Sequence, residues 1–195
     1  METLILLGRA MGLSLTAGIT PYGTAAAIGI VARAGWVDLP DSLEVFASDW
    51  IFWPALALYV VEFFADKIAV VDSIWDVIHT LIRPLAGAIF AILAMDPATL
   101  EGALLTGLLG GSIAGATHLT KAGTRAVVNT SPEPVSNVVV SFLENGLVIA
   151  LLALAVALPF IAFFVAAAVI GVVLVLLIWL YRRLRSLRGR IWREA

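Results

Sequence analysis

The sequence predicts an all-α integral membrane protein with about six transmembrane helices, several of them kinked or discontinuous. Of its 195 residues, 62% are hydrophobic and only 13% are charged, whereas soluble domains average about 45–50% apolar and about 25% charged residues. The charges are segregated, because six of the twelve Lys and Arg residues lie in the last fourteen positions. Cysteine is absent, which excludes disulfides, thiolate metal sites and cysteine nucleophiles.

The first apolar stretch, residues 3–34, is too long for one straight span. As a continuous helix it would measure about 48 Å, against a hydrocarbon core of about 30 Å. The segment G-I-T-P-Y-G at 18–23 predicts a break, because Pro21 removes a backbone donor and the glycines permit unusual dihedral angles. Since the stretch continues past any short signal-peptide core and lacks a convincing cleavage site, we expect a retained helix. An acidic loop is expected over residues 35–49.

Further spans are expected over residues 50–65, 73–95 and 102–129, and a pair within 138–181 broken around Leu158 and Pro159. Pro84 predicts a kink in the third span. In the fourth, glycines four apart form a stripe that lets another helix approach closely; they are Gly107, Gly111 and Gly115. The pattern A-G-x-T recurs 97 positions apart, at 17–20 and 114–117, which is a weak indication of a 3+3 inverted repeat.

The charge asymmetry predicts the orientation. Six C-terminal arginines place residues 182–195 in the cytoplasm by the positive-inside rule, and six crossings then place the N-terminus there too. The acidic loops at 35–49 and 96–101 would lie outside. We therefore expect a multi-pass protein of a bacterial inner (cytoplasmic) membrane, with a transmembrane domain at 1–181 and a basic amphipathic cytoplasmic tail at 182–195.

The tail predicts an amphipathic helix on the membrane surface. Its apolar side would carry Leu180, Leu184, Leu187 and Ile191, with arginines around them. Contact with anionic lipid and a simple topology determinant are equally good interpretations. We expect no nucleic acid as a partner.

Two polar stripes interrupt the third and fourth spans. The first is spaced four, three and four residues apart and comprises Asp72, Asp76, His79 and Arg83. The second is spaced three, four and four apart and comprises His118, Lys121, Arg125 and Asn129. Such spacings put each set on one helical face, and both sets fall in the cytoplasmic half of the predicted bilayer. A charge at membrane depth costs at least about a few kcal/mol, so these residues are expected to face a partner, a cavity or a pathway.

Residues of neighbouring spans could close a ring around these stripes. They are Glu62, Asp66, Asn137, Ser141 and Glu144. The ion- or proton-binding candidates are Glu62, Asp66, Asp72, Asp76 and His79. The anion-binding or charge-balancing candidates are Arg83, His118, Lys121, Arg125 and Asn129. The plainer interpretation is internal ion pairing that fixes helix packing and nothing more.

The ligand of this site stays open on sequence grounds. Asp72, Asp76 and His79 supply oxygen and nitrogen donors suited to a divalent cation, although the fixed charge of Arg83 argues against a metal beside it. Basic pockets between spans bind lipid phosphate, and histidines with carboxylates support proton relays. No cofactor is indicated.

Two long motifs carry a resemblance to a known family. They are V-E-F-F-A-D-K-I-A-V-V-D-S-I-W-D-V-I-H-T-L-I-R-P-L-A-G, within residues 60–87, and H-L-T-K-A-G-T-R-A-V-V-N-T-S-P-E-P-V-S-N. The chain resembles an uncharacterised family of bacterial membrane proteins, a domain of unknown function with relatives in plastid-bearing organisms. The likeness runs from about Gly12 to Ala150. It implies the membrane class and supports the choice of motifs, but it implies no activity.

The leading hypothesis is a small transporter or channel, expected to form a homo-oligomer, with a polar site in the cytoplasmic half of the bilayer. The alternative is a non-transporting structural or assembly subunit of a membrane complex. A membrane-embedded enzyme acting on lipid phosphate comes third. Catalysis has the thinnest support, because neither a G-x-S-x-G nor an H-E-x-x-H motif occurs in the chain.

Overall fold

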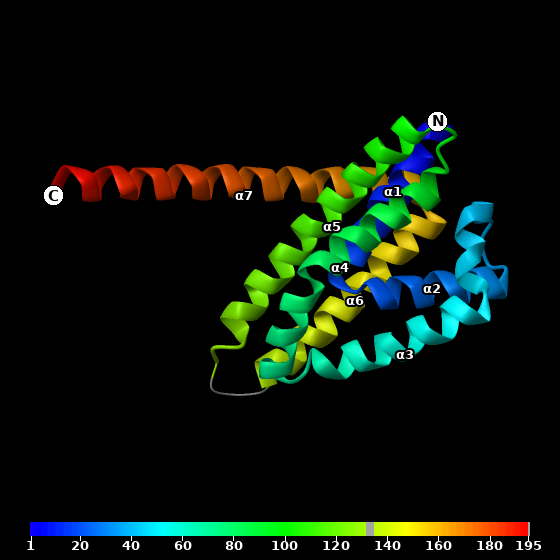
Figure 1. Cartoon of the computed structure of the whole chain (residues 1–195), viewed down its shortest axis with the longest axis horizontal. Coiled ribbons are helices and arrows are strands. Elements are labelled where there is room, and N and C mark those ends of the chain that lie inside the picture. The colour runs from blue at the N-terminus through cyan, green and yellow to red at the C-terminus, as the bar shows by residue number, and fades with distance from the viewer. Residues whose placement is uncertain (132–134, 195) are drawn as a thin grey trace.

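The computed structural model describes residues 1–131 and 135–194. In this part of the chain every regular element is helical, so the predicted all-α fold is confirmed. In chain order the elements are α1 (Glu2–Ile19), α2 (Pro21–Ala34), the 3-10 helix η1 (Asp41–Ala47), α3 (Asp49–Ala65), α4 (Ala69–Met95), α5 (Leu100–Val128), α6 (Val135–Ala157) and α7 (Pro159–Glu194). Figure 1 shows α4 and α5 side by side, with α7 extending away from the bundle.

Both predicted breaks are confirmed. Between α1 and α2, Thr20 has extended backbone angles (φ −147°, ψ 100°). Its hydroxyl accepts a hydrogen bond from the Gly23 N–H at 3.1 Å, and Pro21 occupies the first helical position. This combination of cap and proline starts a new helix where the old one ends. The second break separates Ala157 from Pro159, between α6 and α7.

The broken stretch does not cross the bundle as one span. The Arg9 guanidinium on α1 donates to the backbone oxygen of Asp38, just beyond α2, at 3.4 Å. A Cβ on Gly8 would overlap the backbone of Pro159, so the start of α1 also lies against the α6–α7 break. Figure 1 shows the N-terminus at the same end of the bundle as the turn between α4 and α5.

This arrangement differs from the orientation predicted from the charges. The sequence placed the N-terminus on the opposite side from the loops at 35–49 and 96–101, because it treated residues 3–34 as one crossing. The break at Thr20 instead turns α2 back toward the end from which α1 starts. A cytoplasmic location of both termini therefore does not follow from this fold.

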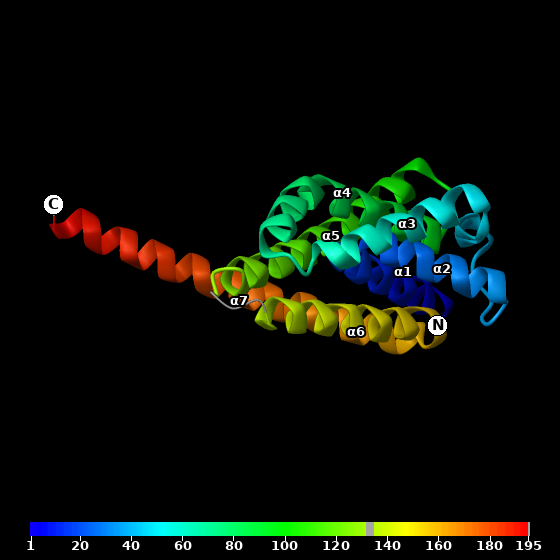
Figure 2. The same cartoon turned by 90° about the horizontal axis from the view of Figure 1, so that it is seen from below.

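Two groups of helices share the bundle. Helix α1 is the central element, buried from Gly8 to Ile19, and it packs on α4, α5, α6 and α7. Helix α2 packs mainly on α3 and η1. Figure 2 shows α1 between the α4–α5 pair on one side and the α6–α7 pair on the other.

Helices α4 and α5 form the most extensive interface. Their backbones approach closely at Gly87 and Gly110, where a Cβ on Gly87 would lie 2.8 Å from the Gly110 carbonyl oxygen. The predicted glycine stripe also faces α4, since a Cβ on Gly111 would lie 3.2 Å from the carbonyl oxygen of Pro84. Helix α4 continues through Pro84, and its ribbon curves instead of breaking (Figure 2).

Several helices are suited to a bilayer. Among the described residues, α1, α4 and α6 are long and apolar enough to cross a membrane, and η1 with α3, bent by 66°, makes a fourth if the pair counts as one span. Their outward side chains include Leu81 (75% exposed) and Ile149 (68% exposed), which suits contact with lipid. The number of six spans stays a prediction, as does the inverted repeat.

The predicted tail is a continuation of α7, which is helical up to Glu194. Figures 1 and 2 show that the C-terminal half of α7, which includes the tail, stands clear of the other helices. The predicted apolar side of the tail falls on side chains outside the described part of the structure. The boundary between a domain at 1–181 and a tail at 182–195 stays a prediction.

Candidate functional site

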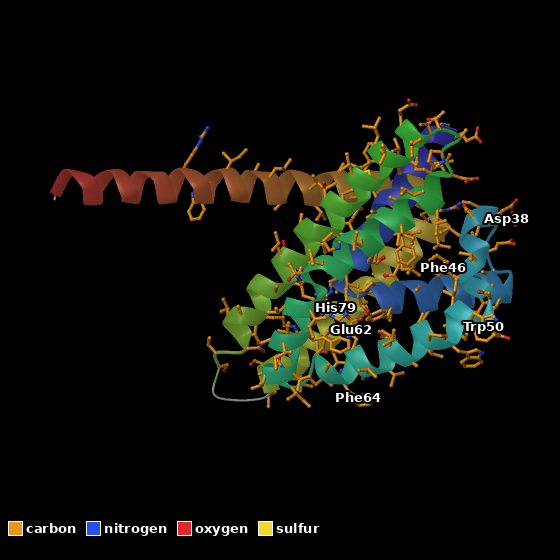
Figure 3. All side chains as sticks on the ribbon, in the orientation of Figure 1. Asp38, Phe46, Trp50, Glu62, Phe64 and His79 are labelled. Carbon is orange, nitrogen blue, oxygen red and sulfur yellow. The ribbon has the colours of Figure 1, made fainter. Side chains whose placement is uncertain are left out.

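The two predicted stripes face each other across the α4–α5 interface. The stripe side chains that are buried are Asp72, Asp76, His79, Arg83, His118, Lys121 and Arg125. Helix α3 adds Glu62 and its C-cap Asp66, and α6 adds Asn137, Ser141 and Glu144. Figure 3 shows Glu62 and His79 close together inside the bundle, whereas Asp38 and Trp50 lie at its end. We call this set of side chains the charge network.

One half of the network is centred on Arg83. Its guanidinium donates to Asp76 Oδ1 at 2.7 Å and to Glu62 Oε1 at 3.1 Å. The same group lies 2.7 Å from His118 Nδ1. The hydroxyl of Thr20, at the α1–α2 break, donates to the second oxygen of Glu62. One buried cation therefore serves two buried carboxylates.

The other half is centred on Lys121 and Arg125. The Lys121 ammonium donates to Asp66 Oδ2 at 2.8 Å and to the carbonyl oxygen of Ile19, at the end of α1, at 3.3 Å. The Arg125 guanidinium donates to Glu144 Oε2 at 2.7 Å and to Asn137 Oδ1 at 2.6 Å. The two cations of α5 thus bind backbone and side-chain groups of α1, α3 and α6.

Asp72 is the least compensated acid of the network. Its Oδ2 accepts from Asn129 Nδ2 at 2.8 Å, but its Oδ1 has no hydrogen-bond partner among the described residues. The nearest cationic atom, Arg125 Nε, is 4.0 Å away, and the side chain is fully buried (0% exposed). A buried carboxylate without a close cation is costly in its ionised form.

Acids outnumber bases in the network. Its five carboxylates are Glu62, Asp66, Asp72, Asp76 and Glu144, and its three cations are Arg83, Lys121 and Arg125. Lys67, between α3 and α4, lies at the edge, where its ammonium bonds the Phe63 carbonyl at 2.8 Å and Ser141 Oγ at 3.3 Å. Even with Lys67 counted, one negative charge remains if both histidines are neutral. Because unbalanced buried charge is unfavourable, the network calls for a bound proton or another cation.

The two histidines differ in their capacity to bind a proton. His118 Nδ1 accepts from Arg83, so its proton belongs on Nε2, which lies 3.2 Å from Thr80 Oγ1. His79 Nδ1 lies 2.7 Å from the carbonyl oxygen of Trp75 and must donate, while Nε2 lies 3.1 Å from the Tyr22 hydroxyl. A hydroxyl both donates and accepts, so His79 can gain a proton without losing a partner. His118 cannot.

The geometry does not favour a metal ion. Within the described ranges, no group of three or more His, Asp or Glu side chains is arranged to hold one. Of the three metal candidates, Asp76 bonds Arg83, both nitrogens of His79 have other partners, and Asp72 bonds Asn129. Their oxygen and nitrogen atoms are directed at separate neighbours instead of at one point.

A cavity opens beside the second half of the network. It has a volume of about 430 Å³ and lies between α1, α5, α6 and α7. Its charged lining residues are Lys121 and Glu144, and most of the others are leucine, isoleucine or valine. A second cavity of about 450 Å³, between α2, α3 and α6, is apolar apart from Tyr59 and Asn145, which bond each other at 2.9 Å.

Comparison with known families places the chain in one of them. The family model described as a domain of unknown function (DUF4126) matches residues 7–183. The chain belongs to this family. The expected membership of an uncharacterised family is confirmed, over a longer range than Gly12 to Ala150. No curated protein and no solved structure matches the chain.

Since the DUF4126 family comes with no activity, the function has to be argued from the site. Four contributors to it were not predicted: Thr20, Tyr22, Trp75 and Thr80. Thr20 directly precedes Pro21 and so carries the signature of a helix cap. Trp75 and Thr80 each lie four residues from a stripe residue, His79 and Asp76 respectively, on the same face of α4. No sequence pattern singles out Tyr22.

Proposed function

We propose that this protein is a small membrane transporter or channel whose charge network binds an exchangeable proton. The observation that carries the proposal is Asp72, a fully buried carboxylate with an unpartnered oxygen and its nearest cation 4.0 Å away. In this environment burial disfavours the ionised carboxylate, and so favours the uptake of a proton by Asp72. A group that holds a proton inside the bundle can also release it when its surroundings change.

The excess of acids supports this proposal over simple packing. Buried ion pairs are often no more stabilising than apolar residues of the same size, so packing alone does not require them. Here the charges come from α3, α4, α5 and α6 and are shared between partners, as with Arg83. Ionisable groups gathered inside membrane helices mark ion and proton pathways.

Within this proposal the residues divide into two roles. The acids and His79 carry protons, with Asp72 and His79 as the exchangeable sites. The basic residues Arg83, Lys121 and Arg125 balance charge, because each already bonds at least one carboxylate. An anion is therefore the less favoured cargo. The setting would be a bacterial inner membrane.

The test is proton flux into liposomes that hold a pH-sensitive dye and contain the purified full chain. An imposed potential should drive proton entry faster than in empty liposomes, and Asp72→Asn should return it to the level of empty liposomes. Asp96→Asn is the matched control, since Asp96 is exposed and has a positive φ (43°) that asparagine accepts well. Circular dichroism checks that both variants are folded. No flux by the wild type, or equal flux by Asp72→Asn, would refute the proposal.

One feature favours the non-transporting subunit as a second candidate. The C-terminal half of α7 stands clear of the other helices (Figure 1), as a helix that docks on another chain would. This candidate predicts a stoichiometric partner that co-purifies in mild detergent. A second copy of the chain, or anionic lipid at the C-terminal arginines, would be the simplest partner.

A further inference from the structure

The cavity beside Lys121 and Glu144, here called the α5–α6 groove, has the make-up of a lipid site. Its apolar lining includes Leu15, Ile19, Leu143, Leu147, Val165 and Val169. Its polar lining consists of Lys121, Glu144 and three threonines of α5, namely Thr117, Thr120 and Thr124. The volume of about 430 Å³ is that of a small-molecule pocket, which typically measures about 300–1,000 Å³.

The two charged groups of the groove leave a gap that a ligand can bridge. Lys121 Nζ and Glu144 Oε2 are 3.9 Å apart, too far for a direct hydrogen bond. Lys121 already donates to Asp66 at 2.8 Å and to the Ile19 carbonyl oxygen at 3.3 Å, and Glu144 accepts three hydrogen bonds from Arg125, at 2.7, 3.1 and 3.1 Å. An ammonium has three donors and a carboxylate about four acceptor positions, so each group keeps about one free position.

A hydroxyl suits this gap better than a charged group does. It can accept a hydrogen bond from Lys121 and donate one to Glu144 at the same time. An anionic head group would meet the carboxylate of Glu144, and a cationic one would meet the ammonium of Lys121. Glu144 is also the most accessible acid of the network, with 14% of its side chain exposed.

The threonines of the groove add hydrogen-bond acceptors. The hydroxyl of Thr120 donates to the Ala116 carbonyl at 2.9 Å, and that of Thr124 donates to the Thr120 carbonyl at 2.9 Å. With their protons engaged, both oxygens are left to accept from a ligand. The hydroxyl of a head group therefore has further acceptors along α5 besides Glu144.

We propose that the α5–α6 groove binds an uncharged lipid with a hydroxyl-bearing head group, of the diacylglycerol class. The hydroxyl lies between Lys121 and Glu144, and the acyl chain lies along the apolar lining of α1, α6 and α7. Asp72 does not line the groove, and this binding does not depend on proton transport.

The test uses the full chain in phosphatidylcholine nanodiscs and four probes. They are dioctanoylglycerol, the same molecule with its free hydroxyl acetylated, dioctanoyl phosphatidic acid and dodecylamine. A ligand that binds only the folded state raises Tm according to its concentration and Kd, and native mass spectrometry gives the stoichiometry. Dioctanoylglycerol should bind one per chain, and acetylation should weaken binding at least about tenfold, since a hydrogen bond to a charged group is lost.

Two variants on α5 separate the groove from the general lipid surface. Thr120→Phe fills the groove without touching an ion pair and should abolish the Tm rise. Ser112→Phe makes a similar change at an exposed position of α5 outside the groove and should leave it unchanged. Glu144→Gln should weaken binding if the variant folds; Thr120→Phe serves where it does not.

Three results would overturn the inference. The first is equal binding of the acetylated and free forms, the second is tighter binding of phosphatidic acid or dodecylamine, and the third is an unchanged Tm rise in Thr120→Phe. The lipid-binding inference and the proposed function can fail separately. If the protein binds the lipid but shows no proton flux, only the proposed function is refuted. If it shows proton flux but binds no lipid, only the lipid-binding inference is refuted.

Discussion

Replacing Arg83 is the sharpest test of the charge network. Arg83→Met keeps the length of the side chain but removes the one cation that holds Glu62 at 3.1 Å and Asp76 at 2.7 Å. Removing one partner of a buried ion pair costs about 3–5 kcal/mol. Because Arg83 is fully buried and serves two acids, we expect the upper end of this range. For a chain of this size, a loss of about 5 kcal/mol corresponds to a Tm lower by about 10–20 °C.

The assay is thermal unfolding of the purified chain in detergent, followed by circular dichroism. Arg33→Met is the matched control, because Arg33 is part-exposed and its pair with Asp49 lies at the surface; such pairs contribute about 0–1 kcal/mol. The triple variant Arg83→Met, Glu62→Gln, Asp76→Asn removes the uncompensated charges and should recover most of the loss. A single variant that melts close to the wild type, or a triple variant no better than the single one, would refute the reasoning.

Two further predictions concern α4 and α5. Gly87→Ala should lower the free energy of unfolding by about 1–3 kcal/mol, because the new methyl group overlaps that of Ala114. In the control variant Gly123→Ala the new methyl group meets open space, so the free energy of unfolding should rise by up to about 1 kcal/mol. Equal losses of Tm in the two variants would contradict this packing. Asn129→Ala removes the hydrogen bond to Asp72 at 2.8 Å and should cost about 1–3 kcal/mol at neutral pH. In the Asp72→Asn background the same change should cost less, and a double-mutant cycle on Tm that shows no coupling would rule the interaction out.

The sequence predicted the elements that depend on local signals. Pro21 and Pro159 each mark a helix start, and the structure has helices beginning at both residues. The stripes were predicted from their spacing of three and four residues, which places side chains on one face wherever the helix goes. Proline chemistry and helical periodicity act within a few residues, so one sequence is enough to detect them.

Features that depend on contacts between distant segments were not predictable. The return of α2 toward the start of α1 rests on contacts such as Arg9 with Asp38, 29 residues away. The pairing of Lys121 with Asp66 and of Arg83 with Glu62 was one of several combinations that the spacing allowed. Which acid would have no cation within hydrogen-bonding distance, and so become the candidate proton site, depends on distances that only the fold determines.

The break at Thr20 has a mechanical consequence. It separates two groups of helices along the chain, one made of α2, η1 and α3 and the other of α1 and the remaining helices, which are joined at Thr20 and at the short turn between α3 and α4. One apolar core holds the groups together, with Phe46 from the first and Phe90 from the second. The pairs Glu62–Arg83 and Asp66–Lys121 also run from the first group to the second. A displacement of one group against the other would therefore have to open these ion pairs. A proton that neutralises either acid weakens its ion pair, which links the charge state of the interior to the contact between the two groups.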